Sequence, residues 1–438
     1  MKCPKCGNEL TEYEEGHYVC ASCGSRFRKK TPAPAPTPVE TKTPEQKRIE
    51  ELESQLAALR EKERIQELER QIAEAQSRIN GEQPTTDLKK EPNSTTTKST
   101  VNLSEPLFRR KGDKTIYFGS YPQSEVKSRS IIDALTSAAG ELPTASNPQK
   151  WTSYKYYIEG KNDVDFMWFI DLDHKGARYR GVYFTSYRPK WTKGPADKEE
   201  SIQYRNGYEQ GYVYWFKFEP IEWRILDQST DTAFLMSEKA LDAQAYVNRY
   251  SEKEGFVYNE EEGTPNGITA NNYLYSWIRS WLNNEFYRTA FDDRQKGAIV
   301  LTTVDNSARS TNPDAFPTKY NKGKNDNACE DTEDYVYLIS YQEAMRKEYK
   351  FNSTNINKDD RKRRLQTTDY MKAQGGYFCV DIPGCEGGAD WWFRSPYPGK
   401  GEFSASIMGA DAEGHSFRRA TAYYVFYGVV PAIRLKLN

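Results

Sequence analysis

The hydrophobic positions divide the chain into a short amino-terminal block, a polar middle and a globular carboxy-terminal part. Residues 81–106 contain almost no apolar side chains, a composition that cannot bury enough surface to fold. From about Leu107 apolar and aromatic residues recur to the end of the chain, over a length sufficient for a core. The pattern predicts a small module over 1–30, linkers at 31–44 and 81–106, a helix over 45–80, and one large domain over 107–438.

Within the large domain, short apolar or alternating runs predict strands. These runs are Thr115–Phe118, Tyr212–Phe218, Glu222–Leu226, Ala233–Met236, Val336–Ile339 and Val429–Leu437. Helical patterns are fewer. One wide apolar stripe predicts a helix over Asn272–Phe286, and a short helix is expected over Tyr341–Glu348 with Ser340 as its N-cap. Short strands with few helices indicate the α+β class.

The segment 45–80 has the spacing of a coiled coil. Proline alternates with small residues over 31–44, which favours an extended spacer before it. Two runs of Ile and Leu then follow the 3-4-3 spacing of a seam, and they are two residues out of register with each other. The helix therefore either changes its partner face near 60–64 or turns back as a hairpin. Because such a helix is marginal alone, we expect a dimer or trimer, with a single charged spacer helix as the alternative.

Four cysteines near the amino terminus have the spacing of a metal site. Cys3 and Cys6 form one C-x2-C pair, Cys20 and Cys23 form a second, and 13 residues lie between the pairs. Each pair lets two sulfurs reach one ion across a tight turn, and four thiolates complete a tetrahedral zinc site with no open position. We therefore expect a structural Zn²⁺ that holds residues 1–30 together. This block resembles the zinc-ribbon family.

Charge and composition exclude several classes of protein. The chain has 62 Lys+Arg against 63 Asp+Glu, so it lacks the basic surplus of a nucleic-acid-binding protein. The basic run Arg26–Lys30 nevertheless leaves an adaptor role through the ribbon open. No stretch has the roughly 20 apolar residues that a membrane helix needs, and the first residues lack a signal-peptide core. We expect a soluble cytoplasmic protein, since a reducing compartment also suits thiolate–metal chemistry.

Several motifs of the large domain resemble a bacterial family of uncharacterised domains with a WW-[LF]-R-S-P signature. In chain order they are FGSYPQ (Phe118–Gln123), PIEWRILD (Pro220–Asp227), LMSEKALD (Leu235–Asp242), WLNNEFYRTAF (Trp281–Phe291), VYLISYQEA (Val336–Ala344), TDYMKAQG (Thr368–Gly375), WWFRSP (Trp391–Pro396) and GVVPAIRL (Gly428–Leu435). The resemblance implies, remotely, the C-type-lectin-like fold shared with formylglycine-generating enzymes. The chain departs from the family at Val430, where the family has Arg, and in an aromatic-rich insert at about 147–211 that could form an embellishing subdomain of strands.

Two segments are candidates for ligand contact. Trp391, Trp392 and Arg394 could form a platform that stacks on a sugar or a cation, and the alternative is a buried tryptophan pair with an arginine held by carbonyls. The run 415–427 mixes aromatic, small and basic residues, as adaptable binding surfaces do. Its candidate residues are His415, Phe417, Arg418, Tyr423, Tyr424 and Tyr427. In the variable proteins of diversity-generating retroelements, which this region resembles, the diversified residues occupy this place; an ordinary hairpin is the alternative.

Two smaller groups could carry chemistry. Cys379 and Cys385 resemble the copper-oxidised cysteine pair of formylglycine-generating enzymes, and Asp381, Glu386 and Asp390 could ligate calcium. The sequence contains no phosphate-cradling glycine loop, zinc-protease motif or nucleophile elbow.

Together these patterns predict a modular, non-enzymatic binding protein that displays a lectin-like domain on a coiled-coil oligomer. Its expected ligand is a protein or a glycan. An oxidase or hydrolase on the same scaffold, and an adaptor acting through the ribbon, remain the alternatives.

Overall fold

A computed structural model of the chain contains two compact units, Met1–Thr100 and Val101–Asn438. In the second unit it describes residues 106–437 except 155, 159–161, 190–195, 249–268, 312–326, 352–359, 399–405 and 416–418. In the first unit it describes residues 2, 8–14, 17–20, 22 and 26–28.

The first unit contains a three-stranded antiparallel sheet in the order β1–β2–β3. Its strands are β1 (Leu10–Glu14), β2 (His17–Cys20) and β3 (Arg26–Arg28). Cys20 is the last residue of β2, whereas Cys3, Cys6 and Cys23 lie outside the described residues. The predicted coiled coil at 45–80 and nearly all of both predicted linkers also lie outside them.

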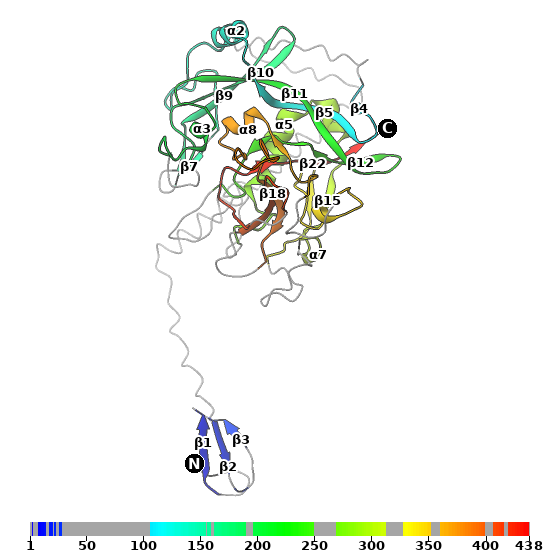
Figure 1. Ribbon diagram of the computed structural model, residues 1–438. Coiled ribbons are helices and arrows are strands. Elements are labelled where there is room, and N and C mark those ends of the chain that lie inside the picture. Colours follow the sequence, from blue (N-terminus) through cyan, green and yellow to red (C-terminus); the bar gives the residue numbers. More distant parts are fainter. Residues whose placement is uncertain are drawn as a thin grey trace, which may run out of the picture. The chain divides into compact units, whose positions relative to one another are not determined.

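The second unit is rich in sheet and has few helices in the part of the chain that the structure describes, as the sequence predicted (Figure 1). Its largest sheet has eight strands, with the path β22–β12–β11–β10–β9–β6; β5 also pairs with β11, and β4 pairs with β5. The strands are β4 (Arg109–Lys111), β5 (Thr115–Glu125), β6 (Thr152–Ser153), β9 (Met167–His174), β10 (Ala177–Phe184), β11 (Val213–Gln228), β12 (Thr232–Ser237) and β22 (Ala432–Lys436).

The long strand β11 joins two halves of this sheet. The sequence predicted separate strands at Tyr212–Phe218 and Glu222–Leu226, but the backbone stays extended between them, with a register shift against β5 at Pro220/Glu222. Proline lacks the N–H that a ladder needs, which accounts for an irregularity rather than a break. The aromatic insert contributes β9 and β10, and β10 pairs directly with β11. The insert therefore extends the main sheet.

A second sheet has five strands in the order β14–β21–β18–β19–β20. Its strands are β14 (Asp242–Ala243), β18 (Trp391–Pro396), β19 (Ser406–Ala410), β20 (Ala420–Thr421) and β21 (Gly428–Val429). Three two-stranded ladders pair β7 (Tyr156–Ile158) with β8 (Asn162–Val164), β13 (Lys239–Ala240) with β17 (Gln366–Thr367), and β15 (Thr302–Val304) with β16 (Thr332–Asp334).

The helices are short. They are α2 (Arg129–Ala139), α3 (Ile202–Arg205), α4 (Trp277–Trp281), the π-helix η2 (Leu282–Phe286), α5 (Tyr287–Ala290), α6 (Asp293–Ala298), α7 (Ala308–Thr311), the 3₁₀-helix η3 (Glu343–Met345) and α8 (Asp369–Ala373). The helix expected over Asn272–Phe286 begins later, because the Ser276 hydroxyl accepts the Arg279 N–H and caps it there, and it continues through η2 and α5. Ser340 caps Glu343 as expected, but only one 3₁₀ turn follows.

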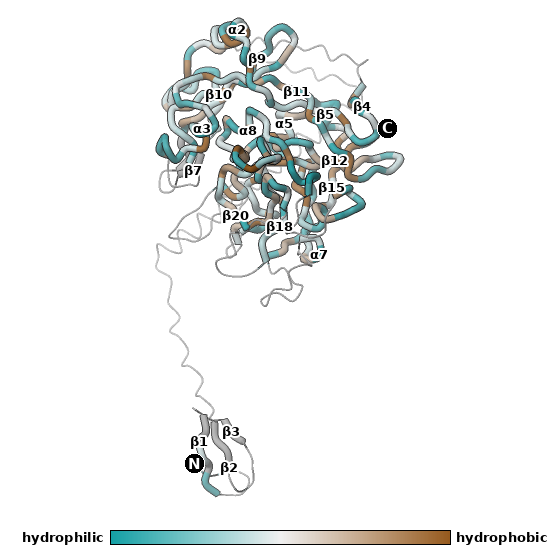
Figure 2. Tube along the Cα trace, in the orientation of Figure 1, coloured by the Kyte–Doolittle hydropathy of each residue, from teal (hydrophilic) through white to brown (hydrophobic). Residues whose placement is uncertain are grey.

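Helices cover both faces of the large sheet. Helix α2 packs on β9, where it encloses a small core that includes Trp151, Trp168, Tyr179 and Trp215. On the other face α5 and α8 contact β5, and α8 also contacts β14 of the five-stranded sheet, so α8 lies between the two sheets (Figure 1). Short hydrophobic stretches inside the elements alternate with hydrophilic ones (Figure 2). None of the described helices is long and apolar enough to cross a membrane.

Candidate functional site

A cavity of about 560 Å³ opens between the insert strands β9 and β10 and the helix that begins with α4. We call it the first cavity. It is lined by Tyr121, Thr152, Ser153, Tyr154, Phe169, Asp171, Arg178, Arg180, Asp242, Gln244, Trp277, Trp281, Glu285, Arg288, Thr289 and Tyr370. Its volume lies within the range of small-molecule sites, and its lining combines aromatic faces with a few polar groups.

The alternation of side chains along β9 and β10 determines which residues form the polar wall of the first cavity. Successive side chains of a strand point to opposite faces, so Phe169 and Asp171 of β9 share a face, as do Arg178 and Arg180 of β10. The register sets Arg180 directly opposite Asp171 and Val182 opposite Phe169. On the opposite face of the two strands, residues such as Trp168 and Tyr179 belong to the small core under α2. The alternation that buries one core therefore directs the charged residues into the cavity.

Arg180 and Asp171 form a bidentate ion pair in this wall. Nε and Nη2 of Arg180 donate to the two carboxylate oxygens at 2.7 and 2.8 Å, and the guanidinium lies 4.2 Å from the ring centroid of Phe169. Burial acts to lower the pKa of Arg180, but Tyr370 and Asp171 outweigh burial, and the pKa is raised. Arg178 also donates to Asp171 at 2.8 Å, so one carboxylate serves two guanidinium groups.

The opposite wall is one face of the continuous helix from α4 to α5. Trp277, Trp281 and Glu285 are spaced four residues apart, and Arg288 and Thr289 follow on the same face. The π-helical turn η2 lies in the middle of this run, and such turns are frequent at functional sites because they re-aim side chains. Trp281 is buried, Trp277 is half-buried, and Glu285 and Arg288 are exposed at the rim. The wall thus offers indole surface inside and charge at the edge.

Tyr121 and Asp242 form a buried polar pair in the cavity. The Tyr121 hydroxyl donates to Asp242 Oδ2 at 2.6 Å, and Asp242 Oδ1 accepts the N–H of Ala243 at 2.7 Å and the side-chain amide of Gln244 at 3.3 Å. Burial raises the pKa of Asp242 above its ordinary value, although the hydrogen bond from Tyr121 acts in the opposite direction. Burial also raises the pKa of Tyr121. The cavity therefore holds a carboxyl that is unusually ready to take up a proton.

A pair of tyrosine hydroxyls joins the insert to helix α8. The hydroxyls of Tyr154 and Tyr370 lie 2.8 Å apart, and the side-chain amide of Gln374 donates to Tyr154 at 3.0 Å. Burial raises the pKa of Tyr370 well above its ordinary value. Tyrosine hydroxyls can both donate and accept, so this pair offers hydrogen bonds of either sense to a ligand.

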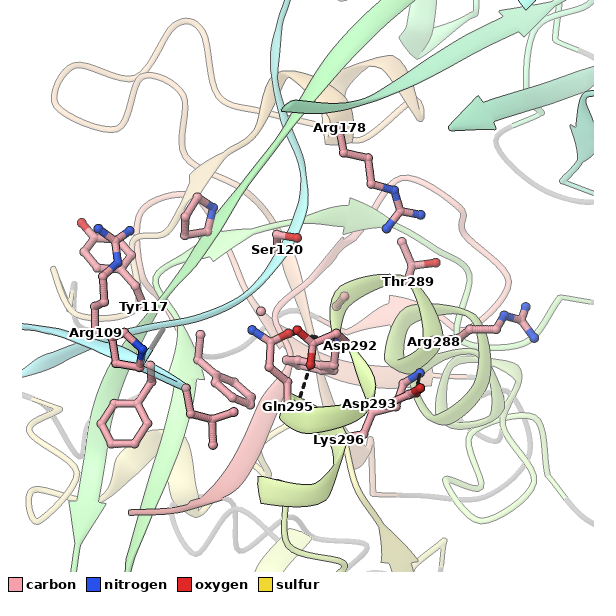
Figure 3. Close-up of a pocket in the computed structure, with 18 residues that line it drawn as sticks. Arg109, Tyr117, Ser120, Arg178, Arg288, Thr289, Asp292, Asp293, Gln295 and Lys296 are labelled. Atoms are coloured by element: carbon pink, nitrogen blue, oxygen red, sulfur yellow. Dashed lines mark hydrogen bonds and ion pairs between the residues drawn. The ribbon is translucent and has the colours of Figure 1, made fainter. Parts of the chain in front are cut away.

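A second cavity, of about 860 Å³, adjoins the first (Figure 3). The two share Arg178, Arg288 and Thr289 in their walls. Gly119 in the second cavity has a φ of +68°, and a Cβ there would come within 2.6 Å of the Phe291 ring. Only glycine fits this close approach. The second cavity is lined by Pro106, Leu107, Phe108, Arg109, Tyr117, Phe118, Gly119, Ser120, Arg178, Pro220, Arg288, Thr289, Ala290, Phe291, Asp292, Asp293, Gln295 and Lys296.

Trp391, Trp392 and Arg394 do not face solvent. All three are at most 1% exposed, and both indole N–H groups donate to backbone carbonyls, at 3.1 and 2.8 Å. Arg394 donates to backbone carbonyls at 2.8 and 3.0 Å and pairs with Glu343. Their assignment to a ligand-facing platform is therefore corrected: β18 is buried along its whole length, and these side chains belong to the core.

The aromatic run before β21 stacks on this core. Tyr427 is 5% exposed, and its ring centroid lies 4.3 Å from that of Trp392. Its assignment to a ligand-facing surface is corrected for the same reason. Tyr424 lies 5.0 Å from Phe426 and 5.7 Å from Tyr423, and both tyrosines are half-buried. The predicted binding surface thus rests on a row of packed aromatic rings, and little of its area is exposed.

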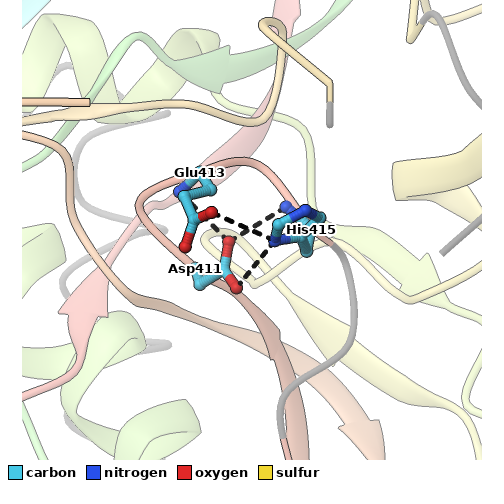
Figure 4. A group of neighbouring side chains, drawn as sticks. All are labelled: Asp411, Glu413 and His415. Carbon is cyan, nitrogen blue, oxygen red and sulfur yellow. Dashed lines mark hydrogen bonds and ion pairs between the residues drawn. The ribbon is translucent and has the colours of Figure 1, made fainter. Parts of the chain in front are cut away.

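His415 lies in a turn with two carboxylates (Figure 4). Its Nδ1 is 3.2 Å from Asp411 Oδ2 and 4.0 Å from Glu413 Oε2, and Asp411 Oδ1 accepts the N–H groups of both other residues. Such a trio has metal-ligating chemistry, but hydrogen bonds inside the turn account for its arrangement. The other two candidates of this run, Phe417 and Arg418, lie outside the described residues.

The remaining chemical candidates do not form a site. Cys379 and Cys385 are buried in a satellite cluster and form no disulfide, and neither lines either cavity. Asp381 and Glu386 are exposed, whereas Asp390 is buried and accepts the Ala412 N–H at 3.0 Å. These three carboxylates do not gather closely enough to share an ion, since the trio at 411–415 is the sole group of that kind among the described residues.

Sequence reasoning missed the first cavity although it had named much of its lining. Tyr121, Asp242, Trp281 and Tyr370 each lie in a different one of the motifs that carry the family resemblance. Tyr154 and Phe169 belong to the aromatic insert. The signal was a polar or aromatic residue inside each motif, but only the tertiary fold brings these positions to one place.

The comparisons with known proteins found one family model that matches part of this region. Residues 230–437, a little less than half of the chain, match a family described as a domain of unknown function (DUF6273). No curated protein and no solved structure was found to match the chain. The matched segment supplies the helix wall, Asp242 and Tyr370, whereas Tyr121 and the insert wall precede it.

Proposed function

We propose that the second unit is a carbohydrate-binding domain and that the first cavity holds the sugar. The observation that carries this proposal is the pairing of aromatic faces on two opposite walls, from Phe169 and from Trp277 and Trp281, around fixed hydroxyl, carboxyl and amide groups. A sugar ring has an apolar C–H face that packs on aromatic rings and a rim of hydroxyls that need donors and acceptors.

The charge state of the cavity also suits an uncharged ring. Arg180 is neutralised by its bidentate partner Asp171, and the raised pKa of Asp242 favours its neutral form more than in an ordinary aspartate. The polar groups are held by one another, so they are pre-organised and lose little freedom when a ligand binds. The inner part of the cavity, around Phe169, Arg180 and Asp242, therefore suits an uncharged sugar ring, whereas Arg178, Glu285 and Arg288 place charge at its edge.

The rest of the chain supports a modular arrangement. We propose that residues 1–30 form a zinc ribbon on Cys3, Cys6, Cys20 and Cys23. The three-stranded sheet of this unit supports the proposal, because its middle strand β2 ends at Cys20. We also propose that 45–80 forms a coiled coil of two or three chains and that the second unit has a lectin-like fold. Linking several weak sugar sites raises their combined affinity without new contacts. Sedimentation of the full chain as a monomer at micromolar concentration would reject the oligomer.

Titration of the full chain with a panel of neutral and acidic oligosaccharides tests the binding function. Tryptophan fluorescence reports binding directly, because two indoles line the cavity. Trp277→Ala is expected to weaken binding about tenfold or more, and Trp277→Phe should recover part of the loss. Tyr212→Ala, which removes a 61% exposed ring outside both cavities, is the matched control and should bind normally. Equal losses in both alanine variants, or no binding by any sugar, would refute the proposal.

Asp242 gives a specific reason to keep a hydrolase as the second candidate. A buried carboxyl with a raised pKa beside a sugar has the properties of a general acid. In that case prolonged incubation would cleave a bound oligosaccharide, and Asp242→Asn would abolish cleavage while leaving binding largely intact. An unchanged oligosaccharide after incubation with the wild-type protein would leave binding as the function.

A further inference from the structure

We infer that the ligand is an acidic oligosaccharide that extends from the first cavity into the second, with its anionic group at Arg178 and Arg288. The inference rests on the proposed carbohydrate-binding function and specifies its ligand. It follows from the wall that the two cavities share and from the charge on that wall.

The shared wall indicates a chain rather than a single sugar. Arg178, Arg288 and Thr289 line both cavities, so the two cavities adjoin and one extended ligand can contact both at this wall. Each volume, about 560 and 860 Å³, is already sufficient for a small ligand. Ser120 and Thr289 near this wall carry hydroxyls that can bond a sugar on its way (Figure 3). An oligomer uses both volumes, whereas a monosaccharide leaves one to water.

The shared wall and its rim carry more positive than negative charge, because three arginines, Arg178, Arg180 and Arg288, lie with two ordinary carboxylates, Asp171 and Glu285. Asp171 accepts hydrogen bonds from both Arg178 and Arg180, so two guanidinium groups share one carboxylate. Arg288 is exposed and has no ion pair in the described part of the chain. Guanidinium groups bind carboxylates with paired, directional hydrogen bonds, so this surplus suits a uronic acid.

The acidic residues of the second cavity do not cancel this charge. Asp292 accepts the Gln295 N–H at 2.8 Å within the capping box of α6, and Asp293 pairs with Lys296 at 3.5 Å. Arg109 lies 5.6 Å from the ring centroid of Tyr117. Both acids thus interact within their own helix. Of the arginines on the shared wall, Arg178 already pairs with Asp171 and Arg288 remains for a ligand.

The test uses uronic-acid oligomers of two, four and six units, prepared from polygalacturonate, alginate and hyaluronan, together with their methyl esters. The ester keeps the shape of each oligomer and removes its charge. For at least one series we expect affinity to rise from two to four units, to fall about tenfold on esterification, and to weaken with salt. Arg288→Gln should remove most of the difference between acid and ester, whereas Arg110→Gln, outside both cavities, should not.

The outcomes separate this inference from the function on which it rests. If neutral oligomers bind as tightly as acids, or if two units bind as tightly as six, the extended acidic ligand is refuted while a Trp277-dependent sugar site stands. If Arg288→Gln leaves the acid–ester difference unchanged, the anion is bound elsewhere and the inference also fails. If no oligomer of either kind binds, the carbohydrate function itself is refuted.

Discussion

The two arginines that share Asp171 provide a direct test of how burial sets the strength of an ion pair. Arg180 is 5% exposed at its side chain and Arg178 is 44% exposed, yet both donate to the same carboxylate at nearly equal distances. Replacing each by methionine keeps most of the aliphatic stem and removes the charge. The two variants therefore differ in the burial of the lost pair and in its geometry, since Arg180 donates two hydrogen bonds to Asp171 and Arg178 donates one.

We expect Arg180→Met to cost about 3 kcal/mol of unfolding free energy. Breaking a buried pair typically costs about 3–5 kcal/mol, because the remaining charge is left without compensation. Here the value falls at the lower end, since Asp171 is 19% exposed and keeps Arg178 as a partner. The contact with Phe169 at 4.2 Å is lost as well. Arg178→Met should cost no more than about 1 kcal/mol, as exposed pairs do.

Urea denaturation of the full chain, followed by tryptophan fluorescence, measures both losses. The cost of Arg178→Met should shrink in high salt, whereas that of Arg180→Met should persist. The double variant Asp171→Leu/Arg180→Met removes both buried charges and should be more stable than Arg180→Met alone. Equal costs for the two single variants would refute the reasoning, because burial would then not distinguish the pairs.

Three further predictions concern packing, protonation and metal. Gly181→Ala should destabilise the protein by about 1–3 kcal/mol, because its Cβ would lie 2.8 Å from the Trp215 ring, whereas Gly297→Ala, with open space in α6, should be neutral or stabilise by up to about 1 kcal/mol in the same denaturation assay. The pKa of Asp242 is raised in the folded state, so the wild type should lose stability relative to Asp242→Asn as the pH rises through that pKa. Asp173→Asn, at an exposed position, is the control. A stability difference between wild type and Asp242→Asn that does not change with pH would contradict this prediction. Metal analysis should find one zinc per chain, and a chelator should unfold the first unit without moving the unfolding transition of the second; a zinc-free folded ribbon would reject the site.

The sequence predicted which helices and strands the second unit contains better than the residues at which each begins and ends. Apolar periodicity located the helix near Trp277 and Trp281, but several polar residues there could have capped it, and only the contact between Ser276 and Arg279 decides which one does. Val336–Ile339 reads as a strand and is buried, yet it joins a ladder through a single bridge, Tyr337 to Ala432. Periodicity reports burial, whereas ladder formation depends on which neighbour the fold supplies.

The site could not be located from local pattern. Trp391 and Trp392 stand out in the sequence because tryptophan pairs are rare, but β18 is buried on both faces, which the local sequence does not reveal. Asp242 attracts no notice in the sequence. Its raised pKa arises from burial in the folded domain, and its hydroxyl partner Tyr121 lies 121 positions earlier in the chain. Long-range contacts of this kind are set by topology, which one sequence does not specify.

The pairing of β12 with β11 limits where this domain can be shortened. The family-matched segment begins after β11, yet Ala233–Ser237 of β12 pair with β11 over five positions and are buried there. A fragment that began at residue 230 would present this row of N–H and C=O groups, with its apolar side chains, as an open edge. A second copy could supply the missing strand, so such a fragment would tend to exchange strands or aggregate. The segment that the family model matches therefore lacks the strand against which β12 is buried.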